Sequence, residues 1–249
     1  MNKSNYIEIN ERAYDCLVQY YIDIFNDPVS QKIKSEIFEG ILRAYAKINN
    51  RHFIPCDEPL SILDLGSGVG IAIQSFLSLL PNSKIVPLEL SENMRLACNE
   101  RFEHIPVMRS NILDVEQKEY ANQFDVVYAS AFIHLFSPED AVKVLDKINS
   151  WLKSNGVLYI STTLHNNPSD FKATIKKEVK TANIERYRMR YSKEVFIKLL
   201  TDNGFVVLES SEREEKTTDK TKLWLNVICK KEVADYERKT ESDKETLRQ

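Results

Sequence analysis

Three closely spaced glycines follow a short apolar run early in the chain. The segment Ile62–Gly70 reads ILDLGSGVG, which predicts a strand that leads through a tight turn into a helix. Glycine is needed where the backbone takes positive φ or lies close to a ligand, and the amino end of a helix offers unpaired N–H donors. A tight turn without a ligand is the alternative, but three glycines behind Asp64 favour a ligand-binding turn.

The spacing of these glycines limits the ligands that the turn could bind. A dinucleotide-binding turn needs a glycine at the sixth position of the pattern, and this chain has Ile71 there. A phosphate-binding P-loop needs Gly-Lys-Ser/Thr, which the segment lacks. The pattern therefore disfavours both classes of nucleotide site.

The segment Leu63–Gly70 resembles the first motif of the class I S-adenosylmethionine-dependent methyltransferases, and the resemblance extends over about residues 62–230. It implies an enzyme that binds S-adenosyl-L-methionine, releases S-adenosyl-L-homocysteine and uses no metal. The residues that it assigns to cofactor binding follow the predicted strands: Asp64, Gly66, Ser67, Gly68, Gly70, Glu89, Leu90, Asn111, Ile112, Ser130 and Ala131.

Several of these residues receive specific roles from the resemblance. Glu89 would accept hydrogen bonds from both ribose hydroxyls, and a carboxylate suits a diol; a carboxylate that only marks the helix start near Ser91 is the alternative. Leu90 would lie on the adenine. Asn111 stands where the family usually has an Asp that accepts from the adenine amino group, and its amide oxygen can still accept, although nearby Asp114 leaves the assignment open.

Two histidines follow the fourth and fifth predicted strands and are candidates for a general base. Methyl transfer is an in-line displacement, so the protein mainly aligns the acceptor and removes a proton. Ser130 and Ala131 should border the methionine part of the cofactor, His134 lies four residues beyond Ser130, and His165 follows the next strand. Histidine titrates near neutrality, which suits a base; a structural role for His134 within an apolar run is the alternative.

A row of arginines precedes the last predicted helix. Residues 172–190 hold seven basic and two acidic side chains, and Arg186, Arg188 and Arg190 alternate with two tyrosines and a methionine. In an extended segment the arginines would share one face and could bind a carboxylate, a phosphate or an RNA backbone. A solvated edge strand is the alternative.

Two helices are expected before the first strand. Apolar residues recur at helical spacing over residues 10–25, and Asp27-Pro28 then supplies an N-cap acceptor and a first-turn proline for a second helix that ends near Asn49. This pair is expected to form a lid over the acceptor pocket. Tyr14 and Tyr21 on the first helix are candidate acceptor contacts, with core packing as the alternative.

After residue 59, short apolar runs alternate with helical stretches. Strands are predicted over 61–65, 84–88, 107–110, 124–129 and 156–162, with helices over 69–80, 91–101 and 138–153. A helix over 192–203 then precedes strands over 205–211 and 223–230, which form an antiparallel hairpin because no helix fits between them. Pro87 costs a ladder hydrogen bond and predicts an early end for its strand.

These elements predict an α/β fold with a doubly wound, mostly parallel seven-stranded sheet, a C-terminal antiparallel hairpin and an N-terminal helical lid. We divide the chain into a lid or cap (1–57), a core (58–231) and a charged tail (232–249). An insertion over 164–191 would lie on the acceptor side of the core.

Composition narrows the function further. A formal net charge of −3 argues against indiscriminate nucleic-acid binding, and four scattered cysteines predict neither a zinc ribbon nor a disulfide framework. The sequence has no long apolar run and no secretory start, so we expect a cytoplasmic protein that does not enter a membrane.

The resemblance leaves the methyl acceptor open. A small metabolite with a nitrogen or oxygen acceptor atom is the favoured partner, and it would be anionic if the arginines contact it. An RNA or tRNA methyltransferase is a less favoured alternative, and a non-catalytic cofactor-binding regulatory or assembly protein is another. The segment after the fourth strand has neither Pro-Pro-Tyr/Phe nor a cysteine, which disfavours methylation of nucleic-acid amines and of cytosine C5.

Overall fold

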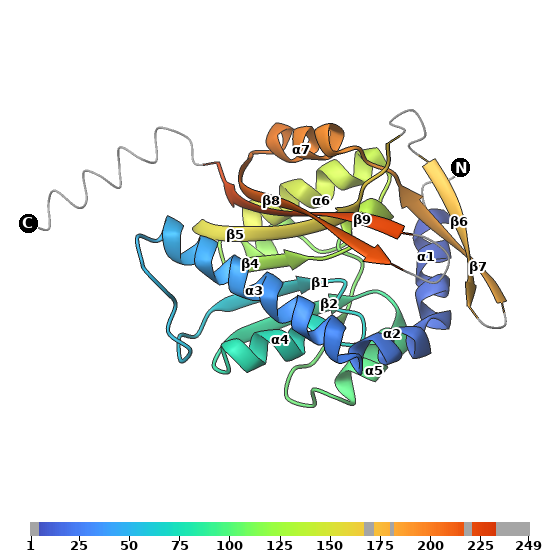
Figure 1. Ribbon diagram of the computed structural model, residues 1–249, viewed down its shortest axis with the longest axis horizontal. Coiled ribbons are helices and arrows are strands. Elements are labelled where there is room, and N and C mark those ends of the chain that lie inside the picture. Colours follow the sequence, from blue (N-terminus) through green and yellow to red (C-terminus); the bar gives the residue numbers. More distant parts are fainter. Residues whose placement is uncertain (1–4, 167–171, 180–181, 217–220, 233–249) are drawn as a thin grey trace, which may run out of the picture.

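The protein is built around one mixed sheet of seven strands in the order β3-β2-β1-β4-β5-β9-β8 (Figure 1). The computed structural model describes residues 5–166, 172–179, 182–216 and 221–232. Strands β1 to β5 are parallel, whereas β9 is antiparallel to both β5 and β8, which confirms the predicted sheet. The strands are β1 Ser61–Leu65, β2 Lys84–Glu89, β3 Met108–Arg109, β4 Phe124–Ala129, β5 Leu152–Thr163, β8 Phe205–Lys216 and β9 Thr221–Lys231.

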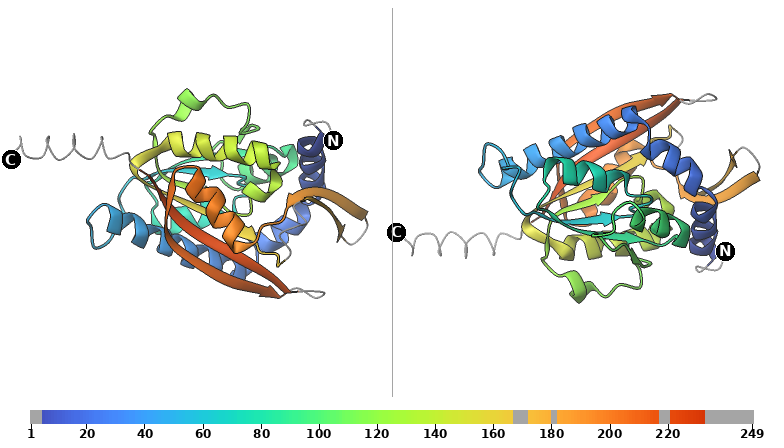
Figure 2. Two further views of the ribbon diagram at one scale, coloured as in Figure 1. Left: turned by 90° about the horizontal axis from the view of Figure 1, so that it is seen from above. Right: turned by 90° about the horizontal axis from the view of Figure 1, so that it is seen from below.

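Helices cover both faces of this sheet (Figure 2). Alternating side chains of β4 explain the two layers, because Val126 and Tyr128 face one core cluster while Val127 and Ala129 face the other. The helices α3 and α4 pack on the first face, and α6 and α7 on the second. The helices are α1 Asn5–Cys16, α2 Val18–Phe25, α3 Pro28–Ile48, α4 Ile71–Leu79, α5 Glu92–Asn99, α6 Pro138–Trp151 and α7 Lys193–Asp202, with short 3-10 turns η1 Gln117–Tyr120 and η2 Ile133–Leu135.

The insertion forms a small sheet of its own at one end of the molecule. Strands β6 (Lys172–Val179) and β7 (Ala182–Met189) pair antiparallel, and α1 lies beside this hairpin (Figure 1). Asn10 of α1 joins β7 to η2, since its Oδ1 accepts from Tyr187 N at 2.9 Å and its Nδ2 donates to Leu135 O at 3.1 Å. The insertion and α1 therefore lie together beyond the strand ends.

Only part of the amino-terminal segment covers the strand ends. Phe38 of α3 packs on Phe76 of α4, with 4.4 Å between ring centroids, so α3 belongs to the layer on the sheet face. The expected single helix over residues 10–25 is wrong, because it breaks at buried Leu17, whose N–H donates to Tyr14 O three residues back and tightens the end of α1.

Some predicted strand and helix boundaries also need correction. β2 does not stop at Pro87 but continues to Glu89. Proline is tolerated there because β3 pairs only with Leu88 and Glu89, so no residue of β3 lies opposite the N–H group that Pro87 lacks. β3 itself has only two residues, which pair with Leu88 and Glu89 of β2. β5 starts earlier than predicted, at Leu152, which pairs with Phe124 across a bulge.

The proposed tail at 233–249 lies outside the described residues. Within the described ranges, no helix is both long and apolar enough to span a membrane.

Candidate active site

A pocket opens at the carboxyl ends of β1 to β4, under α1. It encloses about 930 Å³ of space free of protein atoms, open solvent included. Most of the predicted site residues meet here: Gly66, Gly68, Glu89, Leu90, Asn111, Ile112, Ser130, Ala131, Tyr14 and Tyr21 line it, whereas Asp64, Ser67, Gly70, His134, His165, Arg186, Arg188 and Arg190 do not.

The glycine turn forms the floor of the pocket. Gly66 and Gly68 have φ of +70° and +57°, a conformation that favours glycine. A Cβ on Gly66 would lie 2.9 Å from the ring of Phe132, but a Cβ on Gly68 would meet no atom within 4 Å. Gly68 therefore borders open space in which a ligand can lie against the backbone.

Three predicted residues support the turn from outside the pocket. Gly70 has φ of +89° and an added Cβ would lie 2.5 Å from Phe102, so this glycine is needed for packing. The Ser67 hydroxyl donates to Leu88 O at 3.2 Å. Asp64 is buried, its Oδ2 has no hydrogen-bond partner among the described residues, and burial raises the pKa of its carboxyl to about 7.

Glu89 connects the ends of β1 and β2. Its Oε2 accepts from Gly68 N and its Oε1 from Ser91 N, both at 2.8 Å. Burial raises the pKa of this carboxyl, while the backbone N–H groups of Ser91 and Gly68 oppose the rise. Beside it, Asn111 Oδ1 accepts from Leu113 N at 3.1 Å and orients the amide at the pocket edge.

At the end of β4, the backbone is held by β5 and by a lysine that sequence reasoning missed. Ala131 takes φ of +56° and donates its N–H to Ser161 Oγ at 3.0 Å. Lys34 of α3 donates to Ser130 Oγ at 3.0 Å and to Tyr128 Oη at 3.2 Å, and burial lowers the pKa of its ammonium group. The sequence could have indicated this position of Lys34, because Lys34 precedes buried Phe38 by four residues and residues at this spacing share a helix face.

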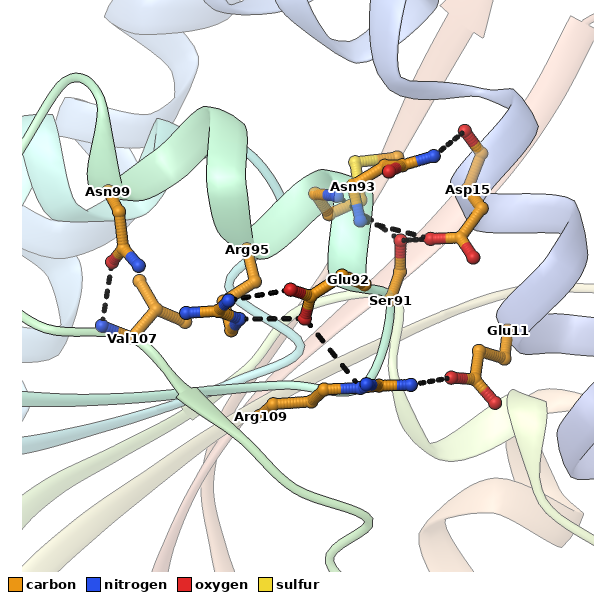
Figure 3. Close-up of polar contacts among 10 residues, drawn as sticks. Glu11, Asp15, Ser91, Glu92, Asn93, Arg95, Asn99, Val107 and Arg109 are labelled. Atoms are coloured by element: carbon orange, nitrogen blue, oxygen red, sulfur yellow. Dashed lines mark hydrogen bonds and ion pairs between the residues drawn. The ribbon is translucent and has the colours of Figure 1, made fainter.

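Polar contacts fix α1 over the pocket (Figure 3). Asp15 Oδ1 accepts from Ser91 Oγ at 2.6 Å and from Asn93 N at 3.1 Å, and Glu11 pairs with Arg109 at 2.8 Å. Ser91 also donates its backbone N–H to Glu89. The position of α1 is therefore connected through Ser91 to a carboxylate that lines the pocket.

His134 lies behind the pocket wall and forms two side-chain hydrogen bonds. Its Nε2 lies 2.6 Å from Arg188 Nη2, and its Nδ1 lies 3.2 Å from Thr162 Oγ1. A guanidinium can only donate, so Nε2 is the acceptor and the ring proton is on Nδ1. Burial, together with the charges of Arg188 and Arg186, holds the pKa of His134 well below its ordinary value, so the ring is neutral.

His165 is partly buried, with its Nε2 3.2 Å from Thr163 Oγ1. Burial and the charges of Arg190 and Arg188 lower its pKa. A general-base role for either histidine stays a prediction.

The neutral state of His134 makes the stability of the fold depend on pH. The unfolded chain binds a proton at this residue near pH 6.5 and the folded chain does not, so the unfolding free energy should fall as the pH drops below 6.5. We expect His134 to contribute about 1.4 kcal/mol of this loss per pH unit. Denaturant titrations at pH 7.5 and 5.5 should show a smaller loss in His134→Ala than in the parent; equal losses would contradict a depressed pKa.

The arginine row lies in β7 and just after it. Only 6% of Arg186 and 9% of Arg188 is exposed, so the alternative of a solvated edge strand is wrong: α1 and η2 cover this face. The predicted alternation is confirmed, because Tyr187 and Met189 point into the main core. Arg186 Nη1 donates to Tyr14 Oη at 3.4 Å, and its guanidinium lies 5.6 Å from the Tyr14 ring centroid.

Comparison with known proteins agrees with this geometry. Residues 63–158, from β1 into β5, match the sequence model of a family described as "Methyltransferase domain". Among solved structures, 1,6-didemethyltoxoflavin-N1-methyltransferase of Burkholderia thailandensis, with S-adenosylhomocysteine bound, superposes with a TM-score of 0.67 over 94% of this chain and 92% of its own, at 16% identity. Residues 63–158 therefore resemble a methyltransferase domain, and the chain has the fold of this S-adenosylhomocysteine-bound methyltransferase. The low identity to the solved structure establishes the fold alone.

Curated relatives match this chain over shorter segments. Malonyl-[acyl-carrier protein] O-methyltransferase of Halalkalibacterium halodurans is 33% identical over 43% of this chain and 40% of its own length. Phosphoethanolamine N-methyltransferase of Plasmodium falciparum is 29% identical over 61% of this chain and 58% of its own length. The alignments thus span less than two thirds of either relative.

Proposed function

We propose that the protein is an enzyme that transfers a methyl group from S-adenosylmethionine to a nitrogen or oxygen atom of a small, anionic metabolite. The observation that carries this proposal is the single pocket that brings Gly68, Glu89 and Asn111 together at the carboxyl ends of three neighbouring strands. Ligands of doubly wound sheets bind at this edge.

The residues present fit this cofactor. The backbone at Gly68 is open to a ligand, the Glu89 carboxylate suits a ribose diol, and Leu90 and Ile112 offer apolar surface for an adenine beside the Asn111 amide. Ser130 and Ala131 line the part of the pocket that would receive the methionine moiety. The buried, unpaired Asp64 Oδ2 beneath the turn is an acceptor suited to an ammonium group.

The chemical demands on the protein are then modest. When bound, S-adenosylmethionine supplies a methyl group that its sulfonium already activates for in-line displacement. The chain has to bind the acceptor next to the end of β4, exclude water with α1, and accept a proton when the acceptor atom carries one. His134 and His165 are the groups that we propose for this proton, and His134 can accept it only when Arg188 releases its Nε2.

Two observations support a small anionic acceptor. The names of the curated relatives include a malonyl group and phosphoethanolamine, which carry a carboxylate and a phosphate. The arginines of β7 lie close behind the pocket wall. Because Arg186 and Arg188 are buried, they suit a small anion better than the extended backbone of an RNA.

Formation of S-adenosylhomocysteine tests the proposal. The purified protein would be incubated with S-adenosylmethionine and, in turn, phosphoethanolamine, a malonyl thioester, a malonyl-acyl-carrier protein and bulk tRNA, with the product measured by chromatography. We expect acceptor-dependent product with a small anionic acceptor, free or carrier-bound, and none with tRNA. Tight cofactor binding without product from any acceptor would instead favour a non-catalytic binding protein.

A further inference from the structure

Arg186 and Arg188 place two cationic groups in the interior of the protein, between α1 and η2. An arginine keeps its charge in proteins, and a buried charge is costly unless an opposite charge or several hydrogen bonds compensate it. Both side chains are more than nine-tenths buried. Groups around the two arginines are therefore expected to compensate their buried charges.

The partners that the described residues supply are all neutral. Arg186 Nη1 donates to the Tyr14 hydroxyl, and Arg188 Nη2 donates to His134 Nε2 at 2.6 Å and reaches Thr163 Oγ1 at 3.5 Å. The buried Nε of Arg186 has no hydrogen-bond partner among the described residues. Within that part of the chain, the pair thus carries two positive charges and an unused donor, and no carboxylate forms a hydrogen bond or ion pair with either guanidinium group. Burial lowers the pKa of Arg188, and Glu215, which pairs with Lys222, opposes this lowering only through its charge.

The pair is also close to the pocket. Tyr14, which accepts from Arg186, lines the pocket together with Tyr21, and Leu135 beside His134 lines it from η2. Tyrosine hydroxyls can donate to an anion on one side while they accept from a guanidinium on the other. An anion at this wall would meet the tyrosine hydroxyls, with the guanidinium group of Arg186 directly behind Tyr14.

We propose that Arg186 and Arg188, with the hydroxyls of Tyr14 and Tyr21, form a subsite for a dianionic oxyanion of the methyl acceptor, a phosphate monoester or a dicarboxylate. A dianion balances the two charges, and forked guanidinium groups match the oxygens of both chemistries. The assignment to the acceptor, but not the existence of the anion site, rests on the proposed function. His134 accordingly positions Arg188 by accepting its hydrogen bond.

The test titrates the full chain with inorganic phosphate and with malonate, with and without saturating S-adenosylhomocysteine, by calorimetry. We expect saturable binding of at least one probe, a loss of about tenfold or more in Arg186→Met, and affinity for S-adenosylhomocysteine unchanged within about twofold. The matched control is Arg12→Met, because Arg12 is an exposed arginine of α1 that pairs with Glu8 at 3.7 Å and should be silent. The probe that binds more tightly identifies the anionic group of the acceptor. Tighter binding of phosphate indicates a phosphate monoester, and tighter binding of malonate indicates a dicarboxylate.

The melting temperature supplies a second measurement. Arg186→Met removes a buried charge without a carboxylate partner among the described residues, so its melting temperature should equal or exceed that of the parent. If Arg186→Met fails to fold, Arg186→Lys takes its place, since lysine keeps the charge but loses the forked donors and should also weaken the probe.

Three results would overturn the proposal. The wild-type chain could bind neither probe, or the Arg186 variants could bind both probes as well as the parent. A loss of S-adenosylhomocysteine affinity in parallel with the probe would assign the arginines to the carboxylate of the cofactor instead of the acceptor. Failure of the proposed function looks different: the chain would bind the probes but not the cofactor.

Discussion

Gly68→Val is expected to abolish the binding of S-adenosylmethionine while the protein stays folded. The Cβ of residue 68 would enter the pocket, where no protein atom lies within 4 Å, so the two valine methyl groups would occupy the space of a ligand that lies against the turn. We expect affinity to fall by roughly a hundredfold or more, on the order of 3 kcal/mol. The positive φ of +57° adds a cost of about 1 to 2 kcal/mol to the stability of the variant.

Calorimetric titration and thermal unfolding, measured together, separate these two effects. Gly40→Ala is a suitable control, because its Cβ would make only an ordinary contact, 3.6 Å from Arg43, far from the turn in sequence and on α3. A second variant, Glu89→Ala, should have a smaller effect. It should weaken the binding of S-adenosylmethionine by about 1 to 3 kcal/mol, because a charge-assisted hydrogen-bond acceptor is lost. A folded Gly68→Val protein with unchanged affinity would refute the cofactor assignment.

The second large effect is expected on turnover. If His134 or His165 removes the acceptor proton, its replacement by alanine should lower kcat by roughly 10² to 10⁴ and leave the affinity for S-adenosylmethionine unchanged. Only the neutral ring can act as a base. Because burial lowers the pKa of both histidines, the rate should fall on the acid side at a pH below the ordinary histidine value.

The pH profile of kcat identifies the residue. The acid limb should disappear in the variant that lacks the base, whereas His104→Ala, which changes an exposed histidine, should keep the parent profile. A His134→Ala variant with normal kcat and a raised KM for the acceptor would show that His134 positions Arg188. Unaltered profiles in both variants would mean that the acceptor needs no base.

Much of the fold could be predicted because its signals are local. The strand over 124–129 has the predicted bounds, and the helix that begins at Pro138 follows a Ser137 side chain that accepts from Asp140 N, as an N-cap should. The turn at Gly66 and Gly68 was readable for the same reason: its positive φ values require glycine whatever packs around it.

The acceptor side was less predictable. Spacing indicated that the arginines share one face of an extended segment, but not whether water or protein covers that face. Protein covers that face, because α1 packs on β7. Asn10 of α1 accepts a hydrogen bond from Tyr187 of β7, although the two residues are 177 positions apart in the sequence. The contact between Lys34 and Ser130 is also between distant parts of the chain, since the two residues are 96 positions apart.

The sequence by itself therefore determined the order of the strands and helices of the main sheet, the glycine turn and the residues at the strand ends, since each depends on φ, hydrogen bonding or apolar spacing within a few residues. Only the tertiary structure decided that Arg186 and Arg188 are buried, that His134 is neutral and bonded to Arg188, and that α3 covers the sheet while α1 covers the pocket. The physical reason is that burial and charge depend on which distant segments meet, and no local pattern of residues encodes that contact.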